Sequence, residues 1–522
     1  MKRRDFLKGT FGAVGSLFCG ELFAAPPDWK HDGEPNLVFG VISDTHLRTT
    51  VWGNRLGANW PDKYLVAALK YFKEQNVDAV MHCGDMAHRG QVQEMAFHAG
   101  AWRRVFGKVN SGPVKLFVTG NHDVDGARYG DFVKKRYPDP EQYASHVLET
   151  DMAANWQRIW GEKYEPVWHK EVKGYHFFGR NWGVSEADAI AALKNWKSGR
   201  DPLHPYFYIQ HSRPSYGVRR ELMRHVGGVS FFGHNHWSIT NWNIIALYKN
   251  RLPVIQCASC EPRGCGALVG DAWITKAAID GRDQAGRGRQ GYVVRVYNDM
   301  LVIQRREFTA GAGAILGSDW ILPLGKFNPH PFIRSEMKKV IGEPQFQDGA
   351  KLLIENADVP ATEGKPAKPV VKLSIPLANA NPDSRVYAYE VAISSGDASH
   401  AGGEDEVMSP NKPGCVAARA EGQGYASEKA FSALPTSNQE PTLSAKTPTS
   451  NWEPTLSASN TIYKAVYASG VNLGIGSEPN GGVTHLTIPK AELPRNKTLS
   501  FTVRPLTSLG TSGKPITAEY KE

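Results

Sequence analysis

Short apolar runs alternate with helical patterns along the first part of the chain. Such runs are typical of buried strands, whereas apolar positions three and four residues apart predict amphipathic helices. Helical patterns lie at about 62–75, 92–108 and 185–197. The resulting order of strand, helix, strand, helix, strand predicts an α/β sheet with its polar site at the carboxyl ends of the strands. The predicted strands are 36–43, 78–83, 114–118, a strand pair within 173–182, 206–210, 229–232, 253–257, 291–297 and 300–306.

The pattern changes after Pro331. Five later segments alternate apolar and polar residues between clusters of Gly, Pro, Asn and Ser, which is typical of a β-sandwich. We therefore expect a first domain at 36–330, a linker at 331–345 and a smaller all-β sandwich at 346–522. The segments are 370–375, 385–393, 461–467, 484–488 and 498–504.

Two further features belong to the second domain. The stretch from Leu499 to Gly510 resembles the last strand and turn of fibronectin type III domains. A Pro-Thr-Ser-Asn segment followed by Glu-Pro-Thr-Leu-Ser occurs twice within about 434–459. Two copies are too few for a solenoid, so we expect a Ser/Thr/Pro-rich insertion there.

The N-terminus has the layout of an export signal. Basic residues at 2–4 precede a short apolar stretch at 9–23 and small residues at 24–26. This stretch is too short for a membrane span, and the paired arginines followed by Phe-Leu-Lys resemble a twin-arginine signal. We expect removal of residues 1–25, a periplasmic or secreted protein without a transmembrane helix, and the twin-arginine translocase as a partner during export. A basic N-terminus followed by a core helix is the alternative.

Net charge and cysteine content add little to the prediction of fold and function. The net charge of +9 over 522 residues fits anionic substrates, but no long Lys/Arg run is present, so we expect no stable nucleic-acid partner. Cys83 lies in an apolar strand and should be a small buried residue. The pairing of Cys257, Cys260, Cys265 and Cys415 stays open between packing and a disulfide.

Polar residues of metal-ligating types directly follow at least four of the predicted strands. Each short motif alone is compatible with an ordinary turn, but chance poorly explains all of them in this order. Mixed nitrogen and oxygen donors suit Zn, Fe or Mn rather than Ca, and a carboxylate such as Asp85 has two oxygens with which to bridge two ions. The motifs are Asp44/His46, Asp85, Asn121/His122/Asp123, His211 and His234/His236.

This set resembles the pattern of the calcineurin-like metallophosphoesterases: Asp-x-His, Gly-Asp, Gly-Asn-His-Asp, a lone His and Gly-His-x-His. The resemblance covers about 36–310 and implies an α/β fold, a sandwich of two mixed β-sheets flanked by helices. It also implies two divalent or trivalent transition metal ions, with Mn, Zn and Fe left open. The first ion would be held by Asp44, His46 and His236, the second by Asn121, His211 and His234, and Asp85 would bridge them.

The resemblance further implies hydrolysis of a small phosphorylated substrate by a hydroxide that bridges the two metals. His122 would stabilise or protonate the leaving oxygen, and Asp123 would orient its imidazole and favour its cationic form. Asn121, His88 and Arg89 are candidate substrate-binding residues. For His88 a place beside the metal ligands, and for Arg89 an ordinary surface position, are equal alternatives. Purple acid phosphatases carry a ligand Tyr where this chain has His88, so a purple iron site is not expected.

The leading hypothesis is therefore an exported metal-dependent phosphohydrolase that cleaves phosphomonoesters or phosphodiesters. One alternative is a nuclease of the same superfamily, and another is an envelope- or glycan-binding protein with an idle metal domain. Five residues near the motif ends are compatible with either substrate contact or packing: Trp52, Arg55, Trp60, Arg213 and Trp237.

Overall fold

A computed structural model gives the structure of the chain. It describes residues 33–48, 62–125, 133–135, 137–196, 203–260, 267–269, 272–274, 289–308, 313–325, 327, 330–359, 366–378, 386–395, 461–468, 483–507 and 509–521. The expected export signal, the insertion at 434–459, Trp52, Arg55, Trp60, Cys265 and Cys415 lie outside these residues.

The first sheet of the N-terminal domain has seven strands in the order β14–β13–β12–β1–β2–β3, with β15 also paired to β13. Strands β1, β2 and β3 run parallel, whereas β12 is antiparallel to both β1 and β13. The carboxyl ends of the three parallel strands therefore meet at one edge. The strands are β1 (Leu37–Ile42), β2 (Ala79–Cys83), β3 (Val114–Val118), β12 (Gln290–Val296), β13 (Met300–Glu307), β14 (Ala314–Ile315) and β15 (Trp320–Pro323).

The second sheet has six strands in the order β4–β5–β6–β7–β9–β8. Its central strands β5, β6, β7 and β9 are parallel, and the edge strands β4 and β8 are antiparallel to their neighbours. The strands are β4 (Val167–Val172), β5 (Tyr175–Arg180), β6 (Tyr206–Gln210), β7 (Gly228–Phe232), β8 (Ile245–Tyr248) and β9 (Leu252–Gln256), and a separate short pair follows, β10 (Ala267–Val269) with β11 (Ala272–Ile274).

The two sheets stack face to face around a shared apolar core. Phe39 of β1 has its ring centroid 5.5 Å from that of Phe177, 4.9 Å from that of Phe207 and 6.0 Å from that of Phe231, all on the second sheet. Near-continuous apolar strands are expected where a parallel sheet is covered on both faces. The predicted pair of mixed sheets is therefore confirmed.

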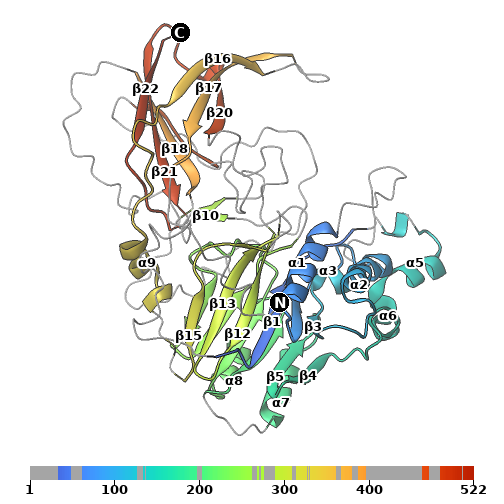
Figure 1. The fold of residues 1–522 in the computed structure, drawn as a ribbon. Coiled ribbons are helices and arrows are strands. Elements are labelled where there is room, and N and C mark those ends of the chain that lie inside the picture. Colours follow the sequence, from blue (N-terminus) through green and yellow to red (C-terminus); the bar gives the residue numbers. More distant parts are fainter. Residues whose placement is uncertain are drawn as a thin grey trace, which may run out of the picture.

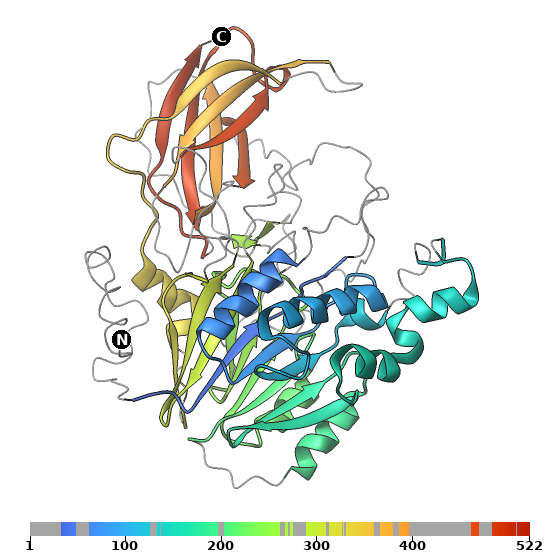
Figure 2. The same cartoon turned by 45° about the vertical axis from the view of Figure 1, so that its right-hand side comes forward.

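Helices cover the outer faces of both sheets (Figures 1 and 2). α1 (Lys63–Glu74), α2 (Val92–Phe106) and α6 (Met152–Trp160) pack on the first sheet, and α7 (Glu186–Asn195) and α8 (Tyr216–Leu222) pack on the second. The short elements α3 (Asn121–Val124), α5 (Pro140–His146) and η2 (Leu148–Asp151) lie between β3 and α6.

The C-terminal part forms two antiparallel sheets around a core that includes Val371, Val391 and Phe501. One sheet has the order β16–β17–β20 and the other β19–β18–β21–β22. Figure 1 shows this sandwich standing beyond one end of the two-sheet domain. Between the two domains lie η4 (His330–Phe332) and α9 (Arg334–Ile341). The strands are β16 (Leu353–Val359), β17 (Lys368–Pro376), β18 (Val386–Ser395), β19 (Thr461–Ala468), β20 (Val483–Pro489), β21 (Thr498–Thr507) and β22 (Ile516–Lys521), with η5 (Lys490–Glu492) after β20.

Two details differ from the sequence-based expectations, and the state of three cysteines is now visible. The strand pair expected within 173–182 begins earlier, at Val167. The segment expected to be a linker contains the helix α9. Cys83 is buried as expected, and Cys257 and Cys260 are buried without a disulfide among the described residues, which favours packing for these two cysteines.

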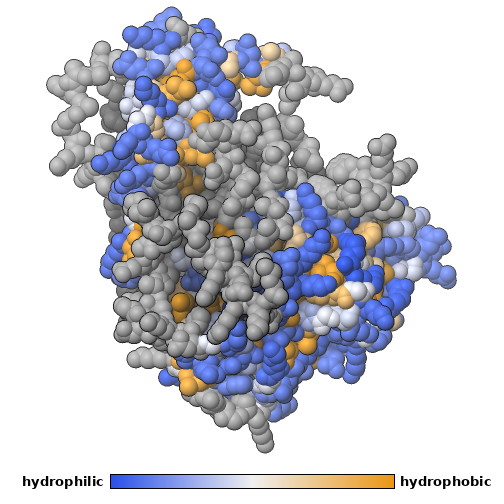
Figure 3. Space-filling model, in the orientation of Figure 1, coloured by the Kyte–Doolittle hydropathy of each residue, from blue (hydrophilic) through white to orange (hydrophobic). Residues whose placement is uncertain are grey.

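The surface and the helices add two observations. In Figure 3 the hydrophobic residues of the visible face form small areas among hydrophilic ones. Among the residues that the structure describes, no helix is long and apolar enough to cross a membrane.

Candidate metal centre

The seven expected ligands come together where strands of both sheets end. β1, β2 and β3 of the first sheet lead into four of them, and β6 and β7 of the second sheet lead into the other three. Three groups of potential ligand atoms, each within 4.8 Å of one another, lie there: one joins His46 to His88 and His122, and two contain expected ligands only and are called the first and second clusters. The first contains Asp44, His46, Asp85 and His236, and the second contains Asp85, His211 and His234.

The first cluster converges on a space between Asp44 and two imidazoles. Asp44 Oδ1 lies 3.1 Å from Nε2 of His236 and 3.8 Å from Nε2 of His46. The two Nε2 atoms are themselves only 3.0 Å apart. Nitrogens that face one another at this distance beside a carboxylate form a donor set suited to a shared cation.

The second cluster also includes the amide of Asn121. Asn121 Oδ1 lies 3.1 Å from both Nε2 of His211 and Nδ1 of His234, and these two nitrogens are 3.1 Å apart. His211 Nδ1 donates to the carbonyl oxygen of Cys83 at 2.8 Å. This hydrogen bond fixes the tautomer of His211 and leaves Nε2 as the ligating atom.

Asp85 lies between the clusters. Its Oδ2 is 3.1 Å from Nε2 of His211 and 3.5 Å from Nε2 of His46, while Oδ1 accepts the backbone N–H of His122 at 2.8 Å. The same carboxylate therefore contacts both groups of imidazoles, which is the position that a bridging ligand requires.

The centre attracts positive charge. Burial would raise the pKa values of Asp44 and Asp85, but the neighbouring imidazoles outweigh it and hold both pKa values well below the usual range. Burial would lower the pKa of His211, but Asp85 and the hydrogen bond between them raise it to about 10. Two buried carboxylates of this kind need cationic partners. The donor set thus fits two transition metal ions, with Asp85 shared.

The backbone at the centre is unusual. Five ligands have positive φ angles, which residues other than glycine rarely adopt and which cost on the order of 1–3 kcal/mol each. Such conformations persist where the surrounding structure holds them, and they cluster at functional sites. The residues and angles are Asp44 (52°), His46 (44°), Asp85 (56°), His234 (76°) and His236 (54°).

Residues that the sequence analysis did not single out hold these turns. Ser43 Oγ donates to Asp44 Oδ2 at 2.5 Å, and the hydroxyl of Ser259 donates to the Asp44 carbonyl at 3.0 Å. The backbone N–H of Cys260 donates to the Ser43 carbonyl at 3.0 Å. Ser43 directly precedes a motif, but Ser259 lies 215 residues from Asp44 and no sequence signal connects them.

A second unanticipated residue is Trp182, which follows β5. Its ring lies nearly parallel to that of His234, with centroids 5.9 Å apart, and edge-on to that of His211 at 5.7 Å. An aromatic side chain therefore lines the second cluster. By contrast, Trp237 is buried in the core between the sheets, and Arg213 contacts Tyr248.

Asp123 does not have the expected contact with His122. Its buried carboxylate accepts the backbone N–H groups of Ala87 at 2.7 Å, Gly120 at 2.8 Å and Met86 at 3.2 Å. Burial and the charge of Asp85 raise the pKa of Asp123 to about 7. The residue therefore ties the turn after β3 to the turn after β2. His122 Nδ1 instead donates to the carbonyl oxygen of His88 at 2.7 Å.

His88 and Arg89 follow Asp85 in the turn after β2. His88 is buried, with its Nδ1 3.4 Å from Nδ1 of His46 and its ring stacked on that of His122. Arg89 is half-buried, and its backbone N–H donates to Glu94 Oε2 at 2.7 Å. His88 thus lies among the metal-site histidines rather than at the surface.

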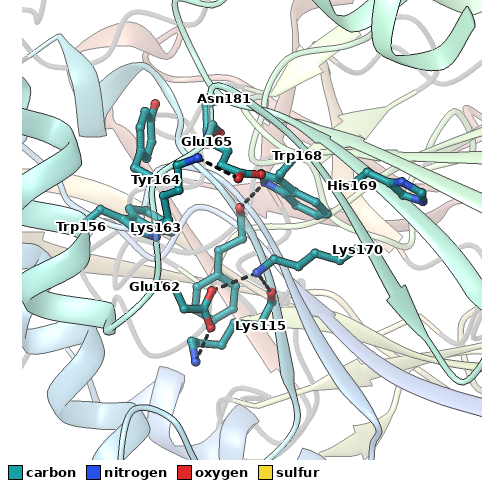
Figure 4. Close-up of a pocket in the computed structure, with 11 residues that line it drawn as sticks. Lys115, Trp156, Glu162, Lys163, Tyr164, Glu165, Trp168, His169, Lys170 and Asn181 are labelled. Carbon is teal, nitrogen blue, oxygen red and sulfur yellow. Dashed lines mark hydrogen bonds and ion pairs between the residues drawn. The ribbon is translucent and has the colours of Figure 1, made fainter. Parts of the chain in front are cut away.

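A separate pocket of about 340 Å³ lies beside β3, β4 and β5 (Figure 4). None of the expected metal ligands lines it. Glu162 ion-pairs there with Lys115 at 2.7 Å and with Lys170 at 2.9 Å. These ion pairs connect Glu162, in the segment after α6, to Lys115 of β3 and Lys170 of β4. The charged groups of the pocket therefore have a structural role.

Comparison with known proteins agrees with this geometry. Residues 37–238 match the family profile described as "Calcineurin-like phosphoesterase". No curated protein matches the chain.

Two solved structures are similar in fold only. A purple acid phosphatase from yellow lupin (Lupinus luteus) seeds is 12% identical over 55% of this chain and 55% of its own, with a TM-score of 0.37. This chain therefore spans about half the length of the lupin protein. A dimetal phosphatase from Danio rerio is 12% identical over 56% of this chain and 100% of its own, with a TM-score of 0.30. At these values nothing about activity follows from either protein. The family match and the two clusters together lead to one conclusion: residues 37–238 form a calcineurin-like phosphoesterase domain, and the ligand clusters of this domain suit metal ions.

Proposed function

We propose that this protein is an exported hydrolase that cleaves phosphomonoesters or phosphodiesters at a centre of two transition metal ions. The observation that carries the proposal is the pair of ligand clusters that share Asp85. Asp44, His46 and His236 would hold one ion, and Asn121, His211 and His234 would hold the other. When bound, the two ions would supply Lewis-acid charge and an activated water at neutral pH.

The chain's own residues support the remaining steps. The Nδ1–H of His122 donates to the His88 carbonyl, which orients the ring, and the Nε2 atom is proposed to act on the substrate. From there it would stabilise or protonate the leaving oxygen, an effect of about 10²–10⁴-fold in general acid catalysis. Trp182 beside the second cluster offers an apolar wall for the organic part of the ester. Arg89 and Asn121 are proposed to bind the phosphoryl group.

The location and the second domain are proposals of the same kind. The basic, apolar and small-residue layout of the first 25 residues supports export through the twin-arginine translocase to the periplasm or beyond. The division of the C-terminal strands into antiparallel sheets of three and four supports a fibronectin type III-like sandwich.

The test compares the wild-type protein with Asp85→Asn, which removes one bridging oxygen and the charge. Metal content and hydrolysis of a chromogenic phosphodiester and the matching monoester are measured on both. We expect about two ions per wild-type chain, as in two-metal sites, and loss of metal and turnover in the variant. Asp188→Asn makes the same chemical change at an exposed position of α7 and is the control. Wild-type protein that binds no metal when Mn²⁺, Zn²⁺ or Fe²⁺ is supplied would refute the assignment.

A further inference from the structure

His88 occupies a position that the expected ligand set does not explain. It lies three residues after Asp85 and is only 3% exposed. Its Nδ1 is 3.4 Å from Nδ1 of His46, and the two ring centroids are 5.5 Å apart. His88 therefore contacts the side of His46 that faces away from the first cluster.

The chemistry of imidazole shows which of the two histidines donates the hydrogen bond and which accepts it. His46 turns its Nε2 toward Asp44, Asp85 and His236, so Nε2 must carry a lone pair to bind a metal. A neutral imidazole then carries its proton on Nδ1. Two Nδ1 atoms at this distance are compatible only if one donates and the other accepts. His46 is consequently the donor and Nδ1 of His88 the acceptor.

We propose that His88 is a positioning residue that fixes the tautomer and ring orientation of the metal ligand His46. The proposal rests on the proposed function only in taking His46 as a metal ligand. Histidine ligands commonly donate their second N–H to a carboxylate, a carbonyl or water, and loss of such a partner typically costs about 10–100-fold in metal affinity or activity. Here a second histidine takes that place.

The same residue also supports His122, but through its backbone. The His88 carbonyl accepts Nδ1–H of His122 at 2.7 Å, and the two rings stack with centroids 5.4 Å apart and planes inclined by 18°. Side-chain substitution leaves the carbonyl in place. The effect on metal binding through His46 can therefore be separated from the orientation of His122.

The experiment titrates Mn²⁺ into metal-free full-length protein and follows free Mn²⁺ by EPR. His88→Leu removes the acceptor at similar volume. His88→Asn keeps an acceptor, because the amide oxygen can occupy the place of Nδ1. His98→Phe is a matched control, since it replaces another fully buried histidine that lies on α2 outside the centre.

We expect His88→Leu to weaken one of two Mn²⁺ sites by about 10–100-fold and to leave the other nearly unchanged. His88→Asn should restore most of the lost affinity, and His98→Phe should bind Mn²⁺ as the wild type does. Excess Mn²⁺ should recover the turnover of His88→Leu, which a general loss of structure would not allow.

Two outcomes overturn the proposal: wild-type affinity at both sites of His88→Leu, or equal loss at both sites that His88→Asn fails to restore. Failure of the proposed function looks different. In that case the wild type itself binds no Mn²⁺, or it binds two ions and hydrolyses neither ester. In the second situation the titration still decides the role of His88.

Discussion

At the scale of single residues, two glycines beside the centre are required because no side chain fits at their positions. Gly120 precedes Asn121 and has an extended backbone, with φ −108° and ψ −175°. A left-handed turn is therefore not what requires glycine here. A Cβ at this position would collide with the Asp85 carboxylate, and a Cβ at Gly233 would collide with Ser43. These glycines let two backbone turns approach the carboxylates.

We predict that Gly120→Ala impairs the centre without unfolding the domain. The added methyl group would overlap both the carboxylate and the backbone nitrogen of Asp85, so Asp85 must shift. A misplacement of about 1 Å at an active site can cost about 10²-fold in rate. Metal content and ester hydrolysis, with circular dichroism for folding, measure the effect. Gly217→Ala on α8 is the control, because its Cβ would make only ordinary van der Waals contacts, with Ile190 Cδ1 at 3.6 Å and Ser215 Oγ at 3.7 Å. Wild-type activity in Gly120→Ala would show that Asp85 can shift freely.

Residue types were predictable from the sequence, whereas residue contacts were only partly so. The order of the motifs indicated which side chains could share a metal, and the two clusters have that composition. The resemblance implied that Asp123 orients His122, whereas in the structure its carboxylate accepts the backbone N–H groups of Ala87 and Gly120. Ser259 and Trp182 reach the centre from distant loops that carry no motif.

At the scale of elements, the helices that bury a regular apolar face were the ones that could be predicted from the sequence. α1 and α2 have apolar faces that bury against the first sheet, so their patterns were clear. The strands β16 and β22 were missed because most of their residues are half-buried or exposed. Both are edge strands of the C-terminal sheets. β16 lacks strict alternation of apolar and polar residues, whereas β22 does alternate but buries only Tyr520.

The buried face of α2 carries a pH-sensitive element. His98 is fully buried against His82, Phe117 and Trp160, and neither ring nitrogen has a hydrogen-bond partner among the described residues. Burial, with a smaller contribution from His82, holds the pKa of His98 well below 6.5. The unfolded chain therefore binds a proton below about pH 6.5 that the folded chain excludes, and stability falls as the pH falls.

We predict that His98→Phe removes this contribution. Between pH 6.5 and the depressed pKa of the folded state, the wild type should lose about 1.4 kcal/mol more per pH unit than the variant. Denaturant unfolding at several pH values from neutral to mildly acidic measures the difference. The variant should also be more stable at neutral pH, because unpartnered ring nitrogens are no longer buried. Parallel pH profiles for the two proteins would contradict the prediction.

At the scale of the whole molecule, α9 joins the two domains through specific contacts. The guanidinium of Arg334 donates to the carbonyl of Leu509, with Nε at 3.1 Å and Nη2 at 2.9 Å, and lies 5.0 Å from the ring centre of Trp242. Met337 and Ile341 of the same helix pack with Leu509. The change in composition after Pro331 predicted two domains, but no sequence pattern shows that α9, Trp242 and Leu509 meet at one interface.

We predict that Arg334→Ala weakens the coupling between the domains and leaves ester hydrolysis unchanged. Loss of charge-assisted hydrogen bonds and a cation–π contact should cost about 2 kcal/mol. Differential scanning calorimetry should show the C-terminal domain unfolding at a lower temperature, and limited proteolysis near α9 should accelerate. Lys339→Ala, which removes only a surface ion pair with Glu336 on the same helix, is the control. Identical calorimetric traces for Arg334→Ala and wild type would exclude the coupling.

The sharing of ligands between the two sheets also has a consequence for the order of biosynthesis. The first cluster lacks His236, and the second lacks His211 and His234, until the ribosome has passed residue 236 of 522. A nascent chain that ends just after Asn121 holds Asp44, His46, Asp85 and Asn121 but can complete neither cluster. Both metal sites can therefore be completed only after the second sheet has been translated. A fragment that ends before His211 should lack ligands of both clusters and bind metal more weakly than the full chain.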